Sequence, residues 1–70
     1  MPESNIIGMR IAKLRKEKGL TQEQLANAVG ITRVAITQYE NGERIPKDEI
    51  KIALSKVLKQ QVGSLFYNEK

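Results

Sequence analysis

The sequence contains no cysteine and no histidine. Without cysteine the chain has no disulfide framework and no thiolate metal ligand, and without histidine it lacks the commonest zinc ligand and general base. No apolar run approaches the roughly 18 residues of a membrane span, and the first residues lack the apolar stretch of a secretory signal peptide. We therefore expect a cytoplasmic, soluble protein with no metal, no cofactor and no membrane contact.

The length and the apolar pattern restrict the fold. A chain of 70 residues forms one domain at most, and we predict a single domain over residues 1–70. No segment alternates with a period of two over a useful length, so we predict no strand. The adjacent carboxylates of Asp48 and Glu49 point apart on successive helical positions and do not converge on a substrate. The sequence thus predicts an all-α protein that is not an enzyme.

Two short helix signatures lie back to back within TQEQLANAVGITRVAITQYENG, and only a glycine-containing turn separates them. In the first, Thr21 and the glutamine three residues later form a capping box, and Gly30 stands where a left-handed residue ends a helix. In the second, Thr32 is the N-cap, and an Asn-Gly turn signal ends the helix. This arrangement predicts a helix-turn-helix over about residues 21–40.

Further helices are predicted on both sides, because isolated helices below roughly 12 residues are marginal in water and need packing partners. The helix before the motif has Ser4 or Asn5 as its N-cap and Gly19 as its stop. Its apolar residues recur at helical spacing: Ile7, Ile11 and Leu14. A helix after the motif starts near Pro46 and Asp48 and carries the apolar residues Ile50, Ala53, Leu54, Val57 and Leu58. A short closing helix contains Val62, Leu65 and Phe66.

The net charge of +4 is unevenly placed. Residues 1–20 carry five basic side chains, residues 46–70 carry five more, and the segment between them is slightly acidic. Basic flanks around a helix-turn-helix would contact DNA phosphates without reading sequence, with Arg10 among them. The alternative is a solvated face on amphipathic helices.

From about Ile7 to Phe66 the chain resembles the phage repressor and Cro (Xre-like) family of helix-turn-helix DNA-binding regulators. The matching segments are LRKEKGLTQEQLA, VGITRVAITQYENG and the proline that follows them. The resemblance implies a lambda repressor-like domain, a compact bundle of about five helices. It also implies that residues 33–40 form a recognition helix in the major groove, while the helix starting at Gln22 crosses the DNA backbone.

Four residues share one predicted outer face of the recognition helix and are our predicted base readers. Arg33 can bond O6 and N7 of guanine, or a phosphate. Val34 suits a thymine methyl group, although a single exposed valine needs no partner. Thr37 can approach a base edge or a phosphate, and Gln38 can bond N6 and N7 of adenine.

Predicted phosphate contacts surround this face. Gln22 can bind phosphate together with the N–H groups of its helix start, or simply begin the helix. Thr32 can do the same or act only as a cap. The resemblance adds Asn41 and Arg44 in the following turn; Asn41 is equally explained as a left-handed turn residue. At position 43 a basic residue is frequent in the family, and Glu43 departs from that pattern.

Three other features bear on structure. The resemblance implies an ion pair between Arg15 and Glu40 that orients the recognition helix. Tyr39 stands where an aliphatic core residue is common, so its hydroxyl must reach water or a partner. The segment 59–61, Lys-Gln-Gln, replaces the usual glycine and apolar residue, which leaves that helix boundary open.

Taken together, these features predict a sequence-specific transcriptional regulator, a repressor, that binds a palindromic double-stranded DNA operator as a homodimer. The predicted dimer surface comprises Val62, Leu65, Phe66 and Tyr67; the first three are equally explained as closing the core. A phage switch, a restriction-modification controller and an antitoxin all remain open. The alternative function is an antitoxin or adaptor that uses this fold to bind a protein antagonist or toxin.

Overall fold

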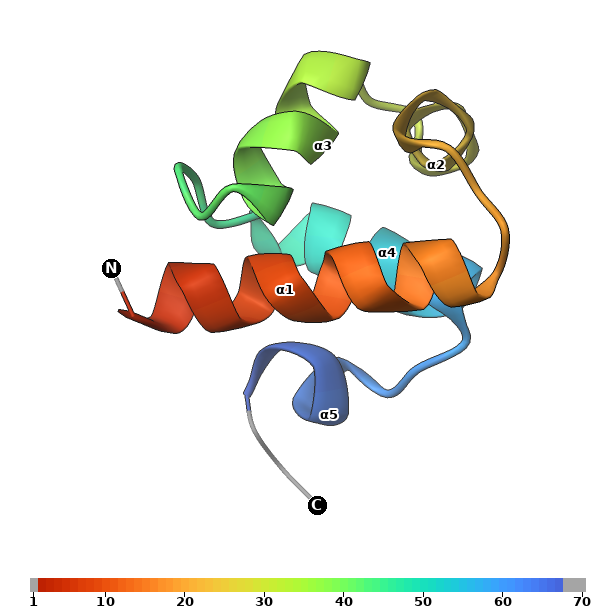
Figure 1. The fold of residues 1–70 in the computed structure, drawn as a ribbon. Helices are drawn as coiled ribbons and strands as arrows, with labels where there is room; N and C mark the ends of the chain where they lie inside the picture. Colours follow the sequence, from red (N-terminus) through yellow and green to blue (C-terminus); the bar gives the residue numbers. More distant parts are fainter. Residues whose placement is uncertain (1, 68–70) are drawn as a thin grey trace.

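This computed structural model describes residues 2–67, which contain five helices joined by short loops. They are α1 (Pro2–Glu17), α2 (Gln22–Val29), α3 (Arg33–Glu40), α4 (Asp48–Leu58) and α5 (Val62–Phe66). In Figure 1, α2 and α3 lie on one side of α1 and α5 lies on the opposite side. The prediction of an all-α bundle of about five helices is confirmed. Within these residues, no helix is both long enough and apolar enough to cross a lipid bilayer.

The ends of α2 and α3 form as their residue types dictate. The Thr21 hydroxyl accepts from the Gln24 N–H at 3.0 Å, and the Gln24 side chain accepts from the Thr21 N–H at 2.9 Å. Gly30 then adopts a left-handed conformation with φ of 86° and ends α2. The Thr32 hydroxyl accepts from the Ala35 N–H at 3.2 Å and begins α3. The capping box, the glycine stop and the second cap are therefore confirmed.

The start of α1 differs from the sequence prediction. The helix already begins at Pro2, so the predicted N-cap at Ser4 or Asn5 is wrong. Proline suits a first helical position because its missing N–H would have no intrahelical partner there. At the other end, Gly19 has a φ of 70°, as expected for the residue that stops this helix.

The helix boundary that the sequence left undetermined, at the end of α4, lies at Lys59. This residue is the C-cap of α4 and has a φ of 56°, the left-handed conformation that usually selects glycine. The Gln60 N–H donates to the Ser55 carbonyl at 2.9 Å, which closes the last turn of the helix. The chain thus makes a left-handed turn at Lys59 without a glycine and begins α5 at Val62.

The core lies where all five helices meet and contains eleven buried apolar side chains: Ile7, Ile11, Leu25, Ala26, Ala35, Ile36, Tyr39, Leu54, Leu58, Leu65 and Phe66. Gly8 lets α1 approach the end of α3 closely, because a Cβ atom there would collide with the carbonyl oxygens of Tyr39 and Glu40. This contact fixes the last turn of α3 against α1.

Candidate nucleic-acid interface

Helix α3 buries one side and exposes the other. Ala35, Ile36 and Tyr39 are buried in the core. On the opposite side, Arg33 is exposed, Val34 is 61% exposed, and the two remaining predicted base readers are half-buried. The structure therefore brings together the four residues that the sequence placed on one face: Arg33, Val34, Thr37 and Gln38.

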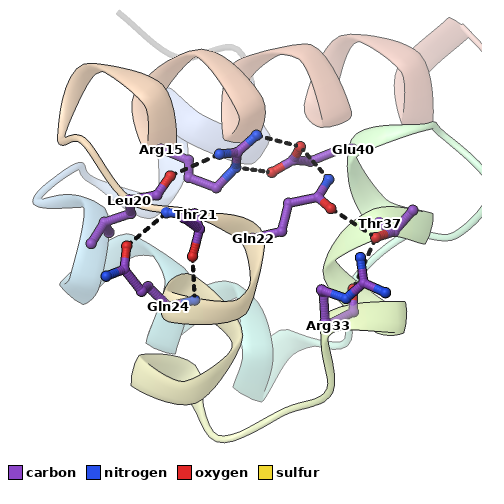
Figure 2. A network of polar contacts seen from close by, with 8 residues as sticks. All are labelled: Arg15, Leu20, Thr21, Gln22, Gln24, Arg33, Thr37 and Glu40. Atoms are coloured by element: carbon purple, nitrogen blue, oxygen red, sulfur yellow. Dashed lines mark hydrogen bonds and ion pairs between the residues drawn. The ribbon is translucent and has the colours of Figure 1, made fainter.

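An ion pair ties the end of α3 to α1 (Figure 2). Arg15 Nε donates to Glu40 Oε2 at 2.7 Å, and a second guanidinium nitrogen donates to Oε1 at 3.1 Å. A third bond runs from Arg15 to the Leu20 carbonyl at 2.7 Å. Both charged side chains are nearly buried, with 11% and 6% exposed. The predicted pair is present, and its two-point geometry fixes orientation as well as distance.

Gln22 joins this pair to the exposed face of α3. Its Nε2 donates to Glu40 Oε1 at 3.0 Å, and its Oε1 accepts from the Thr37 hydroxyl at 3.1 Å. The Thr37 hydroxyl also lies 3.0 Å from the Arg33 carbonyl. The sequence predicts a phosphate contact for Gln22 but does not reveal these internal bonds. Nothing in the spacing of the three residues indicates them, since they depend on how α2 crosses α3.

The start of α2 borders an open hollow in the surface, where predicted phosphate-binding and base-reading residues meet. The hollow is lined by Arg15, Thr21, Gln22, Glu23 and Arg33. The first N–H groups of any helix have no intrahelical acceptor and favour an anion. The Gln22 amide donates one hydrogen to Glu40 and keeps a second one. The Thr32 hydroxyl accepts the cap bond through its oxygen, so it keeps its own hydrogen. Donors are therefore present at both helix starts.

The turn after α3 holds the other predicted contacts. Arg44 donates to Gln38 Oε1 at 3.2 Å, and its guanidinium lies 5.6 Å from the centre of the Tyr39 ring. Asn41 has right-handed angles, with φ of −84°, whereas Gly42 is left-handed. The reading of Asn41 as a left-handed turn residue is therefore wrong. Glu43, Asn41 and Arg44 are all exposed, so the acidic residue stands among the predicted phosphate contacts.

Arg10 does not lie on this surface. Its guanidinium donates to the carbonyls of Ser64 and Leu65, each at 3.3 Å. Those carbonyls belong to α5, which lies on the side of α1 away from α3 (Figure 1). The last carbonyls of a helix have no intrahelical donor, so a nearby guanidinium is an effective cap. Arg10 thus binds α5 within the domain, and its predicted phosphate contact on the basic flank stays a prediction.

The predicted dimer surface is only partly exposed. Leu65 and Phe66 are buried in the core, so the alternative that they close the domain is correct for these two residues. Val62 is half-buried and Tyr67 is 53% exposed. Lys51 donates to the Tyr67 hydroxyl at 3.0 Å and lies 4.7 Å from the centre of its ring. Of the four predicted dimer residues, Val62 and Tyr67 are therefore the two that keep exposed surface.

Comparison with known proteins identifies relatives that share the helix-turn-helix motif. The helix-turn-helix family profile matches residues 11–63. An uncharacterized helix-turn-helix transcriptional regulator of Bacillus subtilis, YqaE, is 41% identical over 59 residues, which cover 84% of this chain and 51% of YqaE. These findings cover most of the chain and include both helices of the motif.

Two solved structures have the same fold. The P22 c2 repressor protein, solved in complex with a synthetic operator, is 36% identical, with a TM-score of 0.87 over 91% of this chain and 97% of that one. The restriction-modification controller protein C.AhdI from Aeromonas hydrophila is 30% identical, with a TM-score of 0.88 over 94% and 100%. These relatives are regulators and repressors rather than enzymes, in agreement with the sequence prediction. The chain spans about half the length of YqaE and 26% of the full repressor of Salmonella phage P22.

Proposed function

Because the chain belongs to the helix-turn-helix family, we propose that it is a sequence-specific DNA-binding regulator of transcription, a repressor, that binds a palindromic operator as a homodimer. The observation that carries this proposal is the exposed side of α3, where donors, acceptors and one apolar side chain stand together on a helix whose other side is buried. An eight-residue helix is about 12 Å long, comparable with the width of the major groove.

Each side chain on this face has a matching base edge. Arg33 would bond O6 and N7 of guanine, and Val34 would contact a thymine methyl group. Gln38 would pair with N6 and N7 of adenine once its oxygen is released from Arg44, whose guanidinium could then turn to a phosphate. Thr37 would contact a base edge beside them.

The surrounding groups would hold this helix in register. Gln22 and Thr32 stand at the starts of α2 and α3, where free N–H and O–H groups favour a phosphate oxygen. Asn41 and Arg44 stand in the turn at the other end of α3. Phosphate contacts at both ends fix the helix position but carry no sequence information themselves.

A second subunit is needed for specificity. One recognition helix reads only a few base pairs, too few to distinguish an operator from the many competing sites of a genome. Two subunits reading half-sites about 34 Å apart, one turn of DNA, would supply the missing contacts. Val62 and Tyr67 are our proposed dimer contacts, because they are the predicted interface residues that keep exposed surface.

Selection from random duplex DNA, followed by affinity measurements across a salt series, tests this proposal. We expect an enriched palindrome with half-sites one turn apart and an affinity that falls steeply as salt increases. Weak binding without any enriched sequence would contradict the proposal. That result would favour the alternative function, an antitoxin or adaptor that binds a protein partner.

A further inference from the structure

Glu40 sets the direction of hydrogen bonding in the polar network of Figure 2. Its carboxylate, held by Arg15, has only acceptor oxygens. The carboxamide of Gln22 lies against Oε1 at 3.0 Å. An amide oxygen in that place would be repelled, so the NH₂ group must face Glu40. The Gln22 oxygen consequently points the other way.

The orientation of the Gln22 amide in turn determines how the Thr37 hydroxyl can bond. The Gln22 oxygen lies 3.1 Å from the Thr37 hydroxyl, and because an amide oxygen carries no hydrogen, the hydroxyl is the donor in any hydrogen bond between them. The Arg33 carbonyl, 3.0 Å from the same hydroxyl, is also an acceptor. A threonine has a single hydroxyl hydrogen, and both acceptors within reach belong to the protein. Whichever acceptor it uses, the hydrogen points into the protein, and turning it toward a ligand would break that internal bond.

What Thr37 offers to a ligand is then limited to its lone pairs. In the major groove the hydrogen-bond donors are the amino groups N6 of adenine and N4 of cytosine, whereas N7, O6 and O4 are acceptors. We infer that Thr37 is a specificity-determining residue that accepts a hydrogen bond from the amino group of adenine or cytosine and does not donate to a base or a phosphate. This inference rests on the proposed function, in which α3 lies in the major groove.

Base analogues within the operator enriched by the native protein test this inference. Purine in place of adenine, and pyrimidin-2-one in place of cytosine, delete the amino group, while 7-deazapurines delete the N7 acceptor. Binding is measured for the native protein, for Thr37→Val, which keeps the side-chain shape without the hydroxyl, and for Thr37→Ser, which keeps the hydroxyl. Circular dichroism and thermal unfolding verify that all three fold alike.

At one base pair of each half-site, we expect deletion of the amino group to weaken binding by the native protein and by Thr37→Ser by about two- to tenfold. The same deletion should leave Thr37→Val unaffected. If the loss of affinity caused by Thr37→Val disappears instead in operators that lack N7, Thr37 donates to N7 and the inference is overturned. It is also overturned if the native protein binds the operator specifically but Thr37→Val changes the affinity loss caused by none of the analogues. If no operator is enriched at all, the proposed function fails and the inference fails with it.

Discussion

Glu40 is the residue on which three helices depend. Its carboxylate accepts from Arg15 on α1 and from Gln22 on α2, while its backbone ends α3. Glu40→Ala leaves a nearly buried guanidinium without its partner, and we expect the free energy of unfolding to fall by about 2–4 kcal/mol. Urea unfolding followed by circular dichroism measures this change.

The double variant Arg15→Met with Glu40→Leu is the matched control for that measurement. It removes both charges and fills the space with apolar side chains, so we expect it to recover part of the lost stability. If the single variant is as stable as the native protein, the pair does not orient α3 as described.

Val34 is a large apolar side chain of α3 that is 61% exposed, and such a group gains free energy when it leaves water to contact a methyl group. Replacing individual operator thymines with uracil deletes that methyl group. At one or two positions we expect the native protein to lose about threefold in affinity, and Val34→Ala to lose less. Equal losses for both proteins would show that Val34 does not contact the methyl group.

At the scale of single helices, the end of α4 carries identifiable strain. Lys59 has a φ of 56°, a conformation that costs a non-glycine residue about 1 kcal/mol or more. We therefore expect Lys59→Gly to raise the free energy of unfolding by about 0.5–1 kcal/mol, measured by urea unfolding. The control is Lys56→Gly, which removes the same charge from the last turn of α4 and should lower stability by about 1 kcal/mol. Destabilisation by both variants would contradict this account of the turn.

Helix ends with one consistent local signal were predictable, whereas the start of α1 was predicted wrongly and the end of α4 was left open. The Thr21 capping box and the stop at Gly30 involve residues within one turn of each other, so their identities suffice. The start of α1 offered competing signals, because Ser4 and Asn5 are good caps while Pro2 is a good first residue. At Lys59 the sequence lacks the usual glycine, and only the observed backbone reveals that the turn still forms.

For the whole molecule, the core and the outward face of α3 followed from helical periodicity, whereas contacts between helices did not. Arg10 looked like a member of a basic flank, but the packing of α5 against α1 supplies carbonyl acceptors for it. The bonds from Gln22 to Glu40 and Thr37 join residues 15 to 18 positions apart. Such partners depend on how helices cross, and one sequence does not specify that geometry.

The proposed dimer makes a prediction about DNA geometry. Inserting five base pairs between the half-sites rotates them by about half a turn, so two subunits joined at α5 cannot reach both. We expect affinity for the spaced operator to fall by at least about tenfold, while an insertion restoring a full turn weakens binding less. Gel-shift titrations measure both. Equal affinity for all spacings would indicate that each subunit binds independently.

The central claim is that the exposed face of α3 reads sequence, and repeating the DNA selection with altered proteins tests it most directly. The native chain, Arg33→Ala and Gln38→Ala would each be incubated with the same random duplex pool, and the enriched motifs compared. We predict that Arg33→Ala loses a guanine preference and Gln38→Ala an adenine preference at defined positions, with the rest of the motif retained. Identical motifs from all three proteins, or none from the native chain, would contradict the claim.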